Sequence, residues 1–142
     1  MRHSLLTSLF LALLITQSPA HADAFDVYGK FLTEEGDSHI TISDCGDSTP
    51  CGRIAWINPA TLEEGQTADT VRAEGNGELL MGMQILSRFE QGKNGWRKGK
   101  IYDPKTDKTY SSRLKRMDSG DLQVKGCIGF ICQTQVWKTV DL

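Results

Sequence analysis

Short runs in which apolar and polar residues alternate follow one another along most of the chain. Ile40 and Ile42, for example, alternate with Thr41 and Ser43, which places both isoleucines on one face of an extended strand. Gly, Asp, Asn and Pro separate these runs. The pattern predicts β-strands over residues 27–33, 39–45, 51–57, 79–89, 96–102, 109–117, 122–127 and 132–140.

Most connections between these strands are as short as hairpin turns. The one long connection, over residues 58–78, is acidic and is expected to contain a short helical turn. Sequential hairpins favour an antiparallel meander, and a long meander tends to close because closure removes exposed edges. We therefore expect an all-β fold, a small antiparallel meander closed into a roughly eight-stranded barrel. A two-sheet sandwich is the alternative.

The first 22 residues have a different pattern. Residues 5–15 are mostly apolar, Arg2 and His3 precede them, and small and polar residues ending in Ala20-His21-Ala22 follow. This is the plan of a secretory signal peptide, and an apolar helix of that length covers only about half of a bilayer's hydrocarbon core. We expect cleavage after Ala22, one domain over residues 23–142, a periplasmic or secreted location, and no membrane insertion.

Four cysteines, Cys45, Cys51, Cys127 and Cys132, lie in the exported part. An even number in an oxidising compartment is typical of disulfides, although four cysteines allow three pairings. We favour the two local pairs, Cys45–Cys51 and Cys127–Cys132, because each brackets a turn-like stretch. Paired ligands of a four-cysteine zinc site are usually separated by about two to four residues, and the spacings here are five and four. We expect no metal and no cofactor.

A small barrel either fills its interior with side chains or holds one small ligand there. Few large aromatic residues and several small ones on the predicted strands favour space for a ligand. Methionines beside tryptophans would give such a cavity an adaptable apolar wall, and a tyrosine and glutamines would orient the ligand. The candidate ligand-binding residues are Trp56, Met81, Met83, Gln84, Tyr110, Gln135 and Trp137. Ordinary core packing is the alternative, and a one-residue slip in register would exchange the faces.

Sequence motifs in the C-terminal part of the chain resemble those of an exported bacterial family, domain of unknown function 2147. The matching residues are Trp96, Gly99, the Ile-Tyr-Asp-Pro turn at 101–104, Lys-Thr-Tyr at 108–110, Leu122, Val124, Gly126, Thr134, Gln135 and Trp137, together with Cys-Gly-Arg-Ile at 51–54.

This resemblance covers most of residues 25–140 and implies a lipocalin-like β-barrel with no known activity. Two segments depart from the family pattern. Gly29-Lys30-Phe31 stands where Gly-x-Trp is usual, and residues 67–77 lack the usual Asp…Asn-Pro…Arg run. We carry over no catalytic residue from the family.

Catalytic motifs do not emerge from the sequence. His39 is the one histidine after residue 22, and neither a nucleophile elbow nor a metalloprotease motif occurs. The acidic pairs at 34–35 and 63–64 lie in predicted turns, where neighbouring side chains point apart. We expect that the protein is not an enzyme.

Charge is unevenly distributed along the exported part. Residues 88–116 carry ten Lys and Arg against three acidic residues, a net charge of +7, and the rest of residues 23–142 carries −10. A solvated outer face explains this stretch, and an anionic or acidic partner is the alternative; nucleic acid is not expected. Two functions remain open: a carrier of a small apolar or amphiphilic ligand, or a non-catalytic envelope interaction or maintenance protein with a filled core.

Overall fold

The computed structural model describes residues 21–141, so the predicted signal peptide lies almost entirely outside the described residues. Nine strands form one antiparallel sheet in the order β4-β3-β2-β1-β9-β8-β7-β6-β5. Their bounds are β1 (Gly29–Leu32), β2 (Ser38–Asp44), β3 (Pro50–Ile57), β4 (Gln84–Ser87), β5 (Glu90–Gln91), β6 (Trp96–Asp103), β7 (Lys108–Arg116), β8 (Leu122–Ile128) and β9 (Ile131–Thr139).

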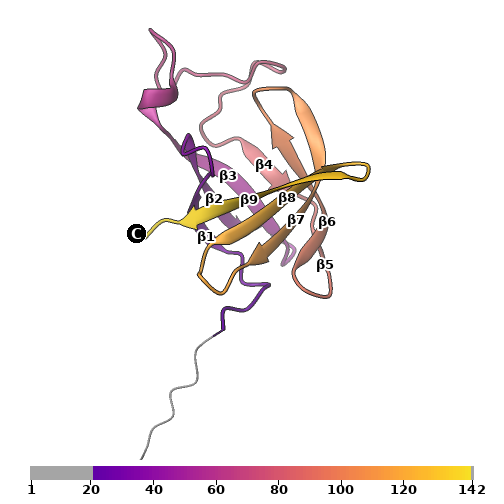
Figure 1. Ribbon diagram of the computed structural model, residues 1–142. Coiled ribbons are helices and arrows are strands. Elements are labelled where there is room, and N and C mark those ends of the chain that lie inside the picture. Colours follow the sequence, from indigo (N-terminus) through magenta and orange to yellow (C-terminus); the bar gives the residue numbers. More distant parts are fainter. Residues whose placement is uncertain (1–20, 142) are drawn as a thin grey trace, which may run out of the picture.

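Pairing between β4 and β6 closes the sheet. The result is an eight-stranded barrel with β5 as a short extra strand beside β6, which confirms the predicted barrel over the sandwich (Figure 1). The expected helical turn in the long connection is η1 (Pro59–Thr61). Within residues 21–141, no helix has the length and hydropathy needed to cross a bilayer.

The strand predicted over residues 79–89 is wrong in its bounds. Only Gln84–Ser87 and Glu90–Gln91 are strands, and Leu79 makes an isolated bridge with Arg72. Gly82 has a φ of 82°, and the Met83 amide donates to the Leu80 carbonyl 3.0 Å away, which closes a turn where the sequence predicts extended chain. The alternation of residues 79–83 therefore belongs to a turn.

A β-bulge changes the predicted orientation of Trp56. Ile40 pairs with Ile54, but the preceding residue His39 pairs with Trp56, so one extra residue separates the two pairs on β3. The bulge places Trp56 on the outer face, 36% exposed, with its ring centroid 4.3 Å from that of His39. The alternation along this strand would place Trp56 on the inner face with Ile54, and the bulge reverses that orientation.

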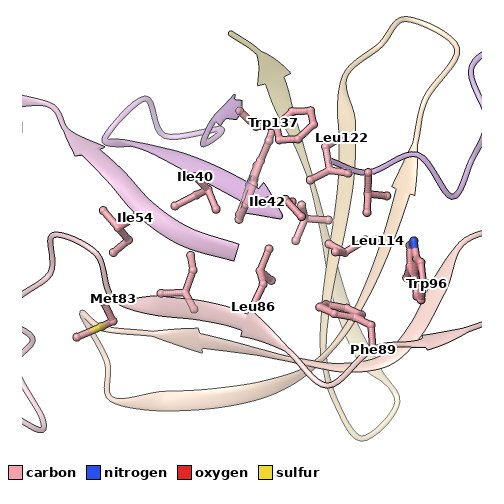
Figure 2. Packing of buried hydrophobic residues seen from close by; sticks show 14 of the residues in the cluster. Ile40, Ile42, Ile54, Met83, Leu86, Phe89, Trp96, Leu114, Leu122 and Trp137 are labelled. Carbon is pink, nitrogen blue, oxygen red and sulfur yellow. The ribbon is translucent and has the colours of Figure 1, made fainter. Parts of the chain in front are cut away.

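Apolar side chains from nearly all strands of the barrel converge in its interior (Figure 2). Trp137, Phe31 and Ile40 are fully buried, as are Leu86 and Leu114. The expected shared face of Ile40 and Ile42 is confirmed by the burial of both residues. One end of the interior is filled in this way, and the opposite end is hollow.

Candidate ligand-binding site

One end of the barrel is closed by the segment that precedes β1. Val27 is fully buried, and the Phe25 ring meets Trp96 edge to face, with the centroids 6.2 Å apart. The Trp96 indole N–H donates to the Phe25 carbonyl over 2.9 Å. Next to it, the Arg116 guanidinium lies 4.9 Å from the centroid of the Phe31 ring. Tight packing and cation–π contact at this end exclude a ligand from it.

A cavity of about 540 Å³ occupies the other end of the barrel. Its wall is mainly apolar and includes Ile54, Ile85, Ile101 and Val124, from strands β3, β4, β6 and β8. Gly126 also faces it, and a Cβ there would lie 3.7 Å from Ile101 and 3.9 Å from Tyr110, which is ordinary van der Waals contact. The missing side chain of Gly126 therefore contributes directly to the free space.

A few polar groups interrupt the apolar wall. Tyr110 from β7, and Gln133 and Gln135 from β9, line the cavity. The Gln135 side-chain oxygen accepts a hydrogen bond from the Trp137 indole N–H at 2.8 Å. Because that oxygen is engaged, the amide NH₂ is the group of Gln135 that is available to a ligand.

Charged side chains from opposite sides of the barrel meet at the cavity mouth. The Lys105 ammonium, in the β6–β7 turn, lies 2.7 Å from carboxylate oxygens of both Glu35 and Asp37 in the β1–β2 turn. In the closed strand order, two strands separate these turns on either side. The ion pair therefore spans the mouth.

Electrostatics favour the charged form of both partners. Burial acts to raise the pKa of Asp37, but hydrogen bonds from Lys105, Thr33 and Ser38 outweigh it and lower that pKa below its ordinary value. Hydrogen bonds to Asp37 and then to Glu35 raise the pKa of Lys105 well above its usual range. Asp37 and Lys105 are therefore both charged near neutral pH, and the ion pair across the mouth is present there.

Two of the seven ligand-binding candidates, Tyr110 and Gln135, line the cavity. Trp137 is buried in the filled core, Trp56 lies on the outer face, and Met81 packs partly buried against the core. These three are corrections to the predicted wall: the bulge turned Trp56 outward, and the turn around Gly82 removed Met81 from a strand.

Met83 and Gln84 lie outside the cavity. They line a shallow, polar depression of about 410 Å³ between β4, β6 and the loop at Asn76 and Glu78. The Gln84 side chain is exposed and accepts a hydrogen bond from Arg53 at 2.7 Å. Gln84 therefore points away from the barrel interior, and its placement in the predicted cavity is also a correction.

Several cavity residues were not among the sequence candidates. Some of them could have been found from the sequence. Gln133 shares its strand face with the candidate Gln135, and the Ile-Tyr-Asp-Pro turn at residues 101–104, noted as a family motif, lines the cavity throughout. No local sequence pattern identifies the mouth residues Glu35, Asp37 and Lys105. These segments are seventy residues apart in the chain and meet only when the barrel closes.

The cysteines pair locally, as the sequence favours. Cys45–Cys51 joins β2 to β3, and Cys127–Cys132 joins β8 to β9 near the hairpin tip. Cys51 is buried, whereas the second disulfide lies beside the cavity wall at Ile128 and Ile131. Among residues 21–141, no three His, Cys, Asp or Glu side chains are grouped as metal ligands.

Comparison with known proteins agrees with this geometry. The family model described as "Uncharacterized protein conserved in bacteria (DUF2147)" matches residues 29–139, which includes every strand of the barrel. The chain belongs to this family. The DUF2147 match confirms the resemblance noted in the sequence.

A solved structure has the same fold as this DUF2147 chain. It is the protein HP1028 from the human pathogen Helicobacter pylori, described as belonging to the lipocalin family, with a TM-score of 0.62 and 19% sequence identity. The similarity covers 82% of this chain and 84% of that one. At this identity it shows a lipocalin-like fold and nothing about the ligand. No curated protein matches the sequence.

Proposed function

We propose that this DUF2147 protein is a carrier that binds one small apolar or amphiphilic molecule in the hollow end of its barrel. The observation that carries the proposal is the cavity of about 540 Å³. Pockets that enclose small molecules are typically about 300–1,000 Å³, mostly apolar, with a few polar groups that fix orientation. Ile54, Ile101 and Val124 supply such a wall, and Tyr110 and Gln135 supply such groups.

The shape of the interior sets the orientation of the ligand. Because the far end is filled by Phe31, Leu114 and Trp137, an apolar chain reaches only part-way down the barrel. The polar end of the ligand then lies at the mouth, beside the paired charges of Lys105. Burial of the apolar end away from water supplies the driving force.

Charge at the mouth restricts the polar end of the ligand. Glu35, Asp37 and Asp103 line the cavity there with a single cation, Lys105. Lys105 is already paired with Glu35 and Asp37, and the three carboxylates outnumber this cation, so the net negative charge of the mouth repels an anionic group. A neutral or cationic polar end therefore suits this mouth better than a free fatty acid.

The compartment is part of the proposal. Two local disulfides suit an oxidising environment outside the cytoplasm. With the predicted signal peptide, they support a periplasmic or secreted location for the carrier. The filled end of the core and the basic stretch 88–116 also fit a second candidate, a non-catalytic envelope interaction or maintenance protein. That candidate needs no ligand.

Titration of delipidated protein with a neutral fluorescent probe such as Nile red tests the carrier proposal. The variant Gly126→Leu places a side chain in the cavity, with room for its first atom beside Ile101 and Tyr110. Thr134→Leu adds the same side chain at an exposed β9 position, on the opposite face from the cavity-lining Gln133 and Gln135, and serves as the matched control. We expect saturable binding to wild type and to the control, and a loss of at least about tenfold in the filled variant.

Competition against the bound probe tests the polar end. Dodecanoate, dodecyl maltoside and dodecyltrimethylammonium share one apolar chain and differ in charge. We expect the anionic competitor to be the weakest. Absence of probe binding to wild type, or equal binding to wild type and Gly126→Leu, would reject the carrier and favour the partner-binding candidate.

A further inference from the structure

The tip of the β8–β9 hairpin exposes three large apolar side chains. Ile128 is 62% exposed, Ile131 is 82% exposed, and Phe130 is as exposed as in an extended chain, at 107%. Figure 1 shows this hairpin, in yellow, extending past the neighbouring strands. Adjacent exposed apolar side chains of this size usually mark an interaction site.

The tip is also free of charge and held rigid. From Gly126 to Trp137 the sequence contains no charged residue. The Cys127–Cys132 disulfide lies directly beneath the tip, so the three side chains are presented by a constrained turn. Little conformational entropy is then lost when the tip is immobilised.

A basic outer wall lies next to the tip. It comprises Lys100, Arg113 and Lys125 in the rows nearer the tip and Lys115 further along β7, on the outer faces of β6, β7 and β8. Arg113 stands directly opposite Lys125, a pairing of like charges that destabilises a sheet unless an anion is near. Within residues 21–141, no salt bridge involves these four side chains.

Acidic groups near the tip lie at the cavity mouth and in the β6–β7 turn, where hydrogen bonds within the protein hold their side chains. In the neighbouring β6–β7 turn, Asp103 accepts hydrogen bonds from the Lys105 amide and the Thr106 hydroxyl, and Asp107 accepts one from Tyr102. The acidic β1–β2 turn contacts β9 at Val136. The tip at Ile131 lies five residues further along β9, roughly 16 Å away.

We propose that this hairpin tip and the basic wall dock the protein on an anionic phospholipid surface. The apolar tip enters the boundary between headgroups and acyl chains, and Lys125 and Arg113 meet lipid phosphates beneath it. Lys125 lies two residues from Cys127 on the same strand face, roughly 7 Å along β8, which matches that depth. This refines the sequence-based expectation of no membrane insertion to peripheral contact without a span.

A bilayer suits the tip better than a protein partner. A stable protein interface buries about 800 Å² on each side, in complementary pockets, whereas the tip is a single convex turn of four residues, 128–131. Lipid requires no preformed pocket. Ile128 and Ile131 also line the cavity, so docking places the cavity mouth at the lipid surface. The docking itself needs no ligand, and it stands or fails separately from the carrier function.

Co-flotation of the mature, disulfide-bonded protein with vesicles tests the proposal. The vesicles are phosphatidylcholine alone, or phosphatidylcholine mixed with phosphatidylglycerol. We expect binding to the mixed vesicles, weakened at least about tenfold by Phe130→Ser with Ile131→Ser. Arg113→Gln with Lys125→Gln should weaken it by about fivefold for each charge removed, and high salt should do the same.

Matched controls remove the same chemistry elsewhere. Leu79→Ser removes another exposed apolar side chain, and Lys93→Gln removes a cation from the β5–β6 turn; both should leave vesicle binding unchanged. Phe130 does not line the cavity, so Phe130→Ser should keep probe binding in solution.

Three results would overturn the docking proposal. The first is that wild type floats with neither vesicle, and the second is that the tip variant binds as well as wild type. The third is a dimer that depends on Phe130 in size exclusion, which would show that a second copy covers the tip. Equal binding to both vesicle types would remove the role of the basic wall.

Discussion

Trp137 and Trp56 should differ sharply in their contribution to stability, although both lie on strands of the same barrel. Trp137 is 2% exposed in the filled core, and its indole N–H donates to Gln135. Trp56 is 36% exposed on the outer wall, and its ring lies against that of His39 with the centroids 4.3 Å apart. The sequence pattern treats both as inward-facing, so their comparison tests the effect of the bulge directly.

The burial difference sets the magnitudes. Truncating a buried tryptophan to alanine costs about 3–5 kcal/mol, from lost transfer free energy and the cavity left behind. An aromatic pair on the surface contributes about 0.5–1.5 kcal/mol beyond its area, so Trp56→Ala should cost about 1–2 kcal/mol. A domain of this length is stable by roughly 6–18 kcal/mol, so Trp137→Ala removes a large share of the total.

Urea unfolding followed by far-ultraviolet circular dichroism measures both variants without relying on tryptophan fluorescence. The midpoint should fall much further for Trp137→Ala, with the slope unchanged. If that variant does not fold, Trp137→Leu should show a smaller loss in the same direction. Equal losses at the two positions, or a greater loss for Trp56→Ala, would refute the assignment of the faces.

Two further predictions concern close packing and the mouth. Gly99→Ala should destabilise the barrel by about 1–3 kcal/mol because its Cβ would overlap the Phe89 ring, whereas Gly126→Ala, with neighbours at 3.7 Å or more, should be nearly neutral by the same unfolding assay. Because the pKa of Asp37 is lowered in the folded protein, its carboxylate contributes to folding stability at pH values above the ordinary pKa of 3.8. This contribution to stability is lost as the pH falls through the lowered pKa. Lys105→Met should therefore lower the free energy of unfolding by about 0.5–1 kcal/mol between pH 5 and 9, a small value because the lysine side chain is largely exposed and solvent screens the pair. This loss should shrink below about pH 4. A loss that stays constant into acid would contradict the ion pair.

Local sequence signals were sufficient for the C-terminal half of the barrel. Strands β6 to β9 begin and end within a residue or two of the predicted ranges, because each has alternating apolar positions and ends at a turn. Both disulfides could be anticipated for the same reason, since their partners are only six and five residues apart. The closed barrel itself followed from the sequence of short links.

Long-range geometry decided what the sequence could not. A single extra residue beside Ile54 reversed the face of Trp56, and alternation carries no sign of such a bulge. The depth at which the core fills depends on all strands together, which is why Trp137 belongs to the core while Gln135, on the same strand face, lines the cavity. The mouth ion pair joins residues 35 and 105 and exists only after closure.

Native mass spectrometry of the protein purified from its own compartment tests the central claim most directly. The carrier account predicts a wild-type species heavier than the disulfide-bonded chain by the mass of one small molecule. The same added mass should persist in Thr134→Leu and disappear in Gly126→Leu, because only the leucine at position 126 occupies the cavity. A wild-type mass equal to the bare chain, or an added mass that Gly126→Leu retains in full, would contradict the account.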